Sequence, residues 1–154
     1  MLTHYLSRST NASVKEDIVR TLSVPWARAS APAIADEFAR VAANDESGLG
    51  WALGNALEVL AGPHLASRMY EFAEDRRYGR ARQMVVLGLA RIPSSQTVDV
   101  LIRLLADDEV VGHAAMALGK LKATPARQQL KLLESHPVDW VRKAVRKALI
   151  NLDK

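Results

Sequence analysis

The sequence predicts an all-α fold, a right-handed α-solenoid in which about four pairs of helices stack side by side. Four related segments recur along the chain, with starts 30, 31 and 31 residues apart. Within each segment the apolar residues are spaced as on one side of a helix. The segments are LGWALGNALEVL from Leu49, GRARQMVVLGLA from Gly79, VVGHAAMALGKL from Val110 and VRKAVRKALINL from Val141.

A second amphipathic stretch precedes each segment, so each repeat is expected to be a pair of helices. We place the pairs at residues 30–61, 62–92, 93–122 and 123–154, within a single domain. Residues 1–29 break the period, but the pattern from Ser13 to Glu16 is typical of a capping box. This predicts one N-terminal helix that covers the open end of the stack, and the lysine-rich end from Val141 to Lys154 is expected to cover the other.

The expected helix boundaries carry residues that commonly begin helices. Asp108 and Asp139 are placed to cap two second helices, because a carboxylate accepts hydrogen bonds from free backbone N–H groups there. Ser47 is expected to do the same for the first segment. Trp26, in the sequence Val24-Pro25-Trp26, is interpreted as part of a packed turn.

Composition restricts the possible environment and chemistry. The chain of 154 residues contains no cysteine, which excludes disulfides, thiolate metal sites and cysteine nucleophiles. No apolar run reaches signal-peptide or membrane-span length, so a cytoplasmic protein without a membrane segment is expected. The net charge of +4 favours acidic partners, although such a charge is also common in proteins kept soluble by Lys and Arg.

The third segment carries a family resemblance. Asp108, Val110, Ala117, Leu118, Gly119 and Leu121 reproduce the pattern Asp-x-Val-x-x-x-x-x-x-Ala-Leu-Gly-x-Leu. Over roughly residues 30–152 the sequence resembles HEAT repeats, and is most similar to small bacterial HEAT-like proteins of the type named after phycobilisome lyase subunits. The resemblance implies a scaffold or binding role, with an accessory role beside a phycobilin lyase as an alternative. Gly79, Gly50 and Gly112 depart from the pattern.

The surface most open to a partner is expected on the second helices, which line the concave side of such a stack. Residues about 100° away from the buried stripe should be exposed there. The candidate binding residues are Trp51, Asn55, Tyr78, Arg82, His113, Met116, Lys120, Trp140, Lys143 and Lys147. Val59, Val85 and Leu89 share these positions, and either face the groove or pack between repeats.

Aromatics and cations on one face predict a non-catalytic module that binds an acidic, partly apolar protein surface. The alternative is DNA binding, because basic side chains could follow a phosphate backbone. The candidate basic track is Arg76, Arg77, Arg80, Arg82, Arg142, Lys143, Arg146 and Lys147. End-to-end dimerisation is a further alternative use of apolar surface. The four histidines show no metal-ligand spacing, so no enzyme activity, metal or cofactor is expected.

Overall fold

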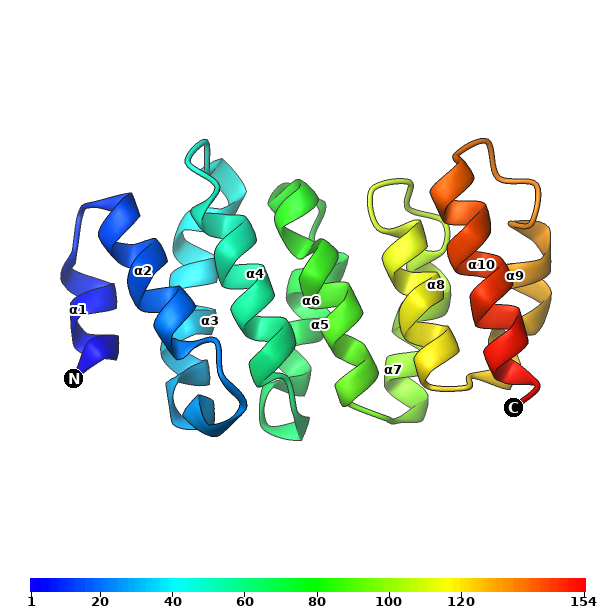
Figure 1. Ribbon diagram of the computed structural model, residues 1–154, viewed down its shortest axis with the longest axis horizontal. Coiled ribbons are helices and arrows are strands. Elements are labelled where there is room, and N and C mark those ends of the chain that lie inside the picture. The colour runs from blue at the N-terminus through cyan, green and yellow to red at the C-terminus, as the bar shows by residue number, and fades with distance from the viewer.

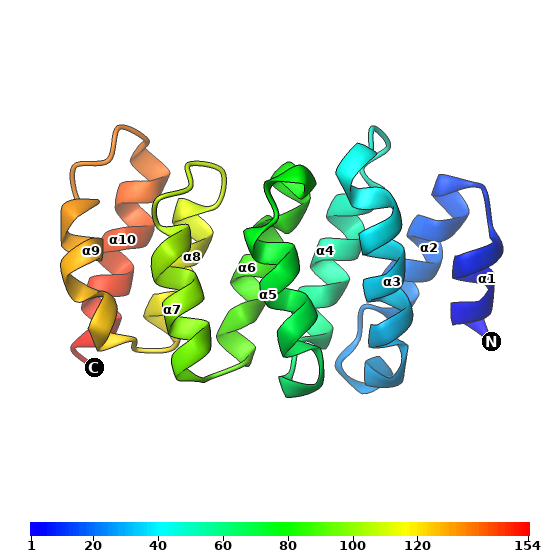
Figure 2. The same ribbon diagram turned by 180° about the vertical axis from the view of Figure 1, so that it is seen from behind.

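The computed structural model describes residues 1–154 and contains ten α-helices, six short 3₁₀ helices and no strand. The helices form two layers in a single row of pairs, so the α-solenoid is confirmed. Figure 1 shows α2, α4, α6, α8 and α10 side by side in one layer, and Figure 2 shows the odd-numbered helices behind them. The two termini lie at opposite ends of the row.

The helix bounds are as follows. The odd-numbered layer contains α1 (Leu2–Arg8), α3 (Ala31–Val41), α5 (Ala66–Glu74), α7 (Ser95–Leu104) and α9 (Arg127–Leu132). The even-numbered layer contains α2 (Ala12–Leu22), α4 (Leu49–Leu60), α6 (Arg82–Gly88), α8 (Val111–Lys120) and α10 (Asp139–Leu152). The 3₁₀ helices are η1 (Pro25–Ser30), η2 (Ala42–Asn44), η3 (Pro63–Leu65), η4 (Arg76–Ala81), η5 (Leu89–Arg91) and η6 (Thr124–Ala126).

The N-terminal region differs from the expected single covering helix, because it contains a helix pair of its own. Helix α2 packs against α4 as α4 packs against α6, so residues 1–22 extend both layers of the stack. The α2 helix begins earlier than the capping-box pattern indicated. The Asn11 side chain accepts hydrogen bonds from the backbone N–H groups of Ser13 and Val14, at 2.9 and 3.2 Å.

One continuous core holds the layers together. A single cluster of 42 buried apolar residues extends from Leu6 in α1 to Leu152 in α10, so the helix pairs share one core. Aromatic rings strengthen the contact between the first helices. The Phe38 ring lies 4.8 Å from that of Phe72 and 5.0 Å from that of Tyr78, measured between ring centroids.

The burial pattern corrects the alignment of the second repeat. Leu53, Arg82, Ala114 and Val145 are all fully buried at equivalent places on the four second helices. Leu53 and Arg82 are 29 residues apart, and Arg82 and Ala114 are 32 apart, whereas equal starts near 30 and 31 were expected. The physical reason is Gly79, whose φ of +47° interrupts the chain inside η4 and delays the start of α6 to Arg82.

The expected capping residues are also corrected. Helix α8 begins after Val110 without a side-chain cap, and Asp107, not Asp108, accepts a hydrogen bond from the Glu109 N–H. Asp139 is the first residue of α10 and does not precede it. Trp26 is 84% exposed, so the expectation of a packed turn was wrong.

Close contacts between neighbouring second helices depend on small residues. A Cβ atom on Gly119 would lie 2.7 Å from the Ala148 Cα, and one on Gly54 would lie 2.5 Å from the Ala81 carbonyl oxygen. Both distances are far below van der Waals contact. The backbones of α8 and α10, and of α4 and η4, therefore approach each other more closely than larger residues would permit.

Candidate binding face

The solvent-facing sides of α4, α6, α8 and α10 form one surface, which we call the second-helix face. With the corrected alignment, equivalent positions on these helices form two rows that cross the stack. The first row is Trp51, Arg80, Gly112 and Lys143. The second row is Asn55, Met84, Met116 and Lys147.

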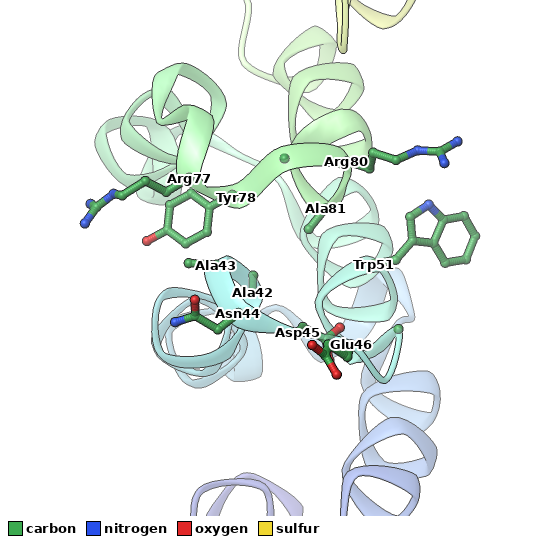
Figure 3. Close-up of a pocket in the computed structure, with 12 residues that line it drawn as sticks. Ala42, Ala43, Asn44, Asp45, Glu46, Trp51, Arg77, Tyr78, Arg80 and Ala81 are labelled. Carbon is green, nitrogen blue, oxygen red and sulfur yellow. The ribbon is translucent and has the colours of Figure 1, made fainter.

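The first row begins with an exposed aromatic side chain beside a cation. Trp51 is 53% exposed although α4 lies in the middle of the stack. Arg80 is exposed at the end of η4 and makes no ion pair. Figure 3 shows both side chains on the same side of the helices, with Arg77 and Tyr78 on the opposite side. Trp51 and Arg80 can therefore contact the same partner.

Trp140 completes the first row at α8. A Cβ atom on Gly112 would lie 2.1 Å from two ring carbons of Trp140, so the indole covers the glycine directly. The same ring makes an edge contact with His113, with centroids 5.4 Å apart. Trp140 is nevertheless 45% exposed, which leaves part of the indole open on the face beside Lys143. The residue thus packs two repeats together and also lines the surface.

The second row is apolar in its middle and basic at its end. Met84 is half-buried, and Met116 is 37% exposed on the next helix. Lys147 is exposed on α10, and Lys120 is exposed one turn after Met116. Methionine side chains adapt their shape to different apolar surfaces, so this row suits contact with a partner's side chains.

Two of the predicted residues do not lie on this face. Arg82 is fully buried, and its guanidinium donates to the carbonyl oxygens of Ala73 and Gly79 and pairs with Asp107 and Glu109. The predicted exposure of Arg82 was wrong because the second repeat is aligned one residue differently. Tyr78 packs its ring against Phe72, at 5.6 Å between centroids, and so lies among the first helices instead of on the second-helix face.

Two aliphatic residues whose role the sequence left open belong to the core. Val85 and Leu89 are fully buried and pack between repeats. In their place α6 exposes Met84 and Leu87, each half-buried, in line with Arg80. Sequence reasoning missed Arg80, Met84 and Leu87. Pairing Val85 and Val86 with Ala56 and Leu57 would have found them, because the glycine and glutamine defects in the expected buried stripe then disappear.

His113 is the one polar side chain on this face with a buried atom left without a partner. Its Nδ1 is buried and makes no hydrogen bond. Burial beneath Trp140 lowers the pKa of the His113 imidazole below its usual value of 6.5, because desolvation disfavours the charged ring. The side chain is therefore neutral near pH 7 and contributes no charge to the face.

Ion pairs neutralise much of the basic track expected from the sequence. Arg76 and Arg82 pair with Asp107, and Arg77 pairs with Asp75. Arg142 and Lys143 both pair with Asp139. The cations of the track that make no ion pair are Arg80, Arg146 and Lys147. These three do not form a continuous line of positive charge along the stack.

A cavity of about 510 Å³ adjoins Trp51 between residues 42–48 and η4 (Figure 3). Asp45 fixes its lower edge, because its carboxylate accepts hydrogen bonds from the Gly50 N–H at 2.6 Å and the Ser47 N–H at 2.9 Å. Burial raises the pKa of Asp45, but these bonds and the one from the Ser47 hydroxyl outweigh it, so the pKa lies below its usual value. Asp45 is thus a structural residue and not a free ligand.

The structure contains no group of three or more His, Cys, Asp or Glu side chains arranged to hold a metal ion. None of its helices has the length and apolar character needed to cross a membrane.

Comparison with known proteins identifies the repeat. HEAT repeats match residues 66–150, which is more than half of the chain. A crystal structure described as an engineered protein, from the Northeast Structural Genomics Consortium, has a TM-score of 0.60 with 21% sequence identity and covers 99% of this chain and 78% of its own. At this identity the likeness concerns the fold alone. No curated protein matches the sequence. The chain belongs to the HEAT-repeat family.

Proposed function

We propose that this chain is a non-catalytic protein-binding module that holds an acidic, partly apolar segment of a partner protein on its second-helix face. HEAT repeats commonly mediate contacts between proteins. The observation that carries the proposal is Trp51, an indole 53% exposed in the middle of the stack. Tryptophan and arginine are enriched where binding energy concentrates, and here Trp51 and Arg80 lie side by side.

Charge supports an acidic partner. Arg80, Lys120 and Lys147 are exposed on the face and make no ion pair within the chain. A carboxylate brought next to them would gain a partner without breaking an existing ion pair. Met84, Met116 and Trp140 supply apolar contact between these cations, so a partner with both acidic and apolar side chains fits the face best.

Nucleic-acid binding has weaker support. Of the eight cations in the expected basic track, five are paired with carboxylates of the chain itself. A phosphate backbone would have to compete with Asp75, Asp107 and Asp139 for those cations. The accessory role beside a phycobilin lyase comes from family resemblance, and no side chain on this face favours it.

A capture experiment with a matched control tests the proposal. Wild-type protein, Trp51→Ala and Trp26→Ala are immobilised and exposed to lysate of the source cell, with and without nuclease. Trp26 is the control because it is 84% exposed but lies in η1, away from the second-helix face. We expect a protein that binds wild type and Trp26→Ala, survives nuclease treatment and is lost on Trp51→Ala.

Either of two outcomes would contradict the proposal. A captured protein retained equally by Trp51→Ala would place its binding site elsewhere. Capture of material that nuclease removes would favour nucleic acid instead. For a captured protein, the dissociation constant should also rise less steeply with salt than the slope of about −0.9 per neutralised phosphate that is typical of duplex DNA.

A further inference from the structure

We infer that the bound segment is an extended chain of the polyproline-II type, which presents every third side chain to successive second helices and places its carboxylates over α10. This inference rests on the proposed function and names the form and polarity of the partner. It follows from three features of the second-helix face: the spacing of its rows, their apolar middle and the position of their lysines.

The spacing of the rows sets the repeat of the ligand. Packed helices lie about 8–10 Å apart, so equivalent side chains on α4, α6, α8 and α10 recur at about that interval. A polyproline-II chain rises about 3.1 Å per residue with three residues per turn, so its equivalent side chains recur every ~9.3 Å. Side chains on one face of a β-strand recur every ~6.6 Å, and successive turns of an α-helix every ~5.4 Å. Only the polyproline-II repeat stays in step with four helices.

The middle of the face suits apolar side chains. Met84 on α6 and Met116 on α8 occupy equivalent positions, and Trp140 lies beside Met116 in the neighbouring row. A ligand with apolar side chains three residues apart would place one over each methionine. Trp51 and Trp140 add flat aromatic surfaces of the kind on which proline-rich chains pack.

The charges give the ligand a direction. Both rows end in a lysine on α10, Lys143 and Lys147, and Lys120 is exposed on the adjacent α8. The opposite end of the face carries acidic residues, with Glu46 exposed before α4 and Glu58 on α4 paired with Arg91. Carboxylates of the ligand therefore gain attraction over α10 and meet repulsion over α4.

Synthetic peptides of one composition test the inference directly. The first has two leucines three residues apart and two glutamates after a further three residues, with proline and alanine elsewhere. The second has the same residues with the leucines two residues apart, which suits a β-strand. Binding to the full-length protein is measured by fluorescence anisotropy. We expect the first peptide to bind at least about tenfold more tightly, a difference of about 1.4 kcal/mol.

Two lysine variants test the direction. Lys147→Ala should weaken the first peptide by about fivefold or more, and a version with glutamine in place of glutamate should be unaffected by the change. Lys131→Ala is the control, because Lys131 is exposed on α9 in the other layer and makes no ion pair. Equal effects of the two variants would overturn the assignment of the carboxylates to α10.

The outcomes separate this inference from the proposed function. If both peptides bind equally well, or the strand-spaced peptide binds better, the polyproline-II periodicity is wrong. If neither peptide binds but a captured protein still depends on Trp51, the protein-binding function stands and the inferred ligand form fails. If capture is also independent of Trp51, both fail.

Discussion

The Arg82 guanidinium lies 2.8 Å from the Asp107 carboxylate, and this buried ion pair joins the second and third repeats. The other second helices place Leu53, Ala114 and Val145 at the position of Arg82. The charge is tolerated there because the guanidinium also donates to the Ala73 carbonyl oxygen at 3.0 Å and pairs with Glu109. A buried charge with this many partners fixes the position of one repeat on the next.

Removing Arg82 should therefore destabilise the fold strongly. We expect Arg82→Ala to lower the free energy of unfolding by about 3–5 kcal/mol, because it leaves the Asp107 carboxylate buried without its main partner. Urea denaturation monitored by circular dichroism measures the change. Arg146→Ala is the matched control, since Arg146 is exposed without an ion pair, and should change stability by less than about 0.5 kcal/mol. Similar losses for both variants would contradict a structural role for Arg82.

A methyl group at Gly112 should displace Trp140. The added Cβ would lie 2.1 Å from the indole ring, so Gly112→Ala should cost about 1–3 kcal/mol and shift tryptophan fluorescence. In a Trp140→Ala background the same change should cost much less, because the obstructing ring is gone. Gly62→Ala is the control, since its Cβ meets only the exposed His64 side chain. Additive costs would show that Gly112 is not reserved for the indole.

Stability should fall on mild acidification because of His113. Its pKa is lower in the folded protein than the usual 6.5, so the unfolded chain binds the proton first as pH falls. The loss begins near the unfolded pKa and stops once pH falls below the folded one. Denaturation at about pH 7.5 and about pH 5.5 should show a smaller pH effect in His113→Gln than in wild type. An unchanged pH dependence in His113→Gln would rule this histidine out as the cause.

Gly79 should resist substitution for a backbone reason. Its φ of +47° is disfavoured for residues with a side chain, although the nearest atom to an added Cβ is Glu109 Oε1 at 3.8 Å. Gly79→Ala should cost about 1–2 kcal/mol in thermal unfolding, through conformation and not through a clash. Gly79→Asn should cost less, since asparagine adopts left-handed conformations more readily than alanine. An asparagine variant as unstable as the alanine variant would indicate that space limits this position.

The sequence predicted the layers of the fold better than its ends. The four segments with helical apolar spacing correspond to α4, α6, α8 and α10, because burial of one stripe per helix leaves a periodic signal. The N-terminal pair lacks that period. A charged pair replaces apolar contact there, since Lys15 on α2 is buried and bonded to Glu37 on α3. Lysine and glutamate read as surface residues until their partner is known.

The binding face was predicted correctly in position but not in every residue. Trp51, Met116 and Lys147 are exposed as expected, because their helices follow the regular spacing. Tyr78 and Arg82 are not, because Gly79 changes the register of one helix by a single residue. A shift of one residue turns a helix by about 100°, which is enough to exchange a core position for a surface position. Periodicity alone does not reveal where such a shift occurs.

The buried arginine also limits how this array could be shortened. Asp107 is followed 31 residues later by Val138, at the equivalent place in the last repeat. A gene deletion that removed the third repeat cleanly would bring Arg82 against that valine and leave a guanidinium in the core without a carboxylate. The repeats share one architecture, yet their order is fixed, and they are not interchangeable units that can be lost or shuffled at no cost.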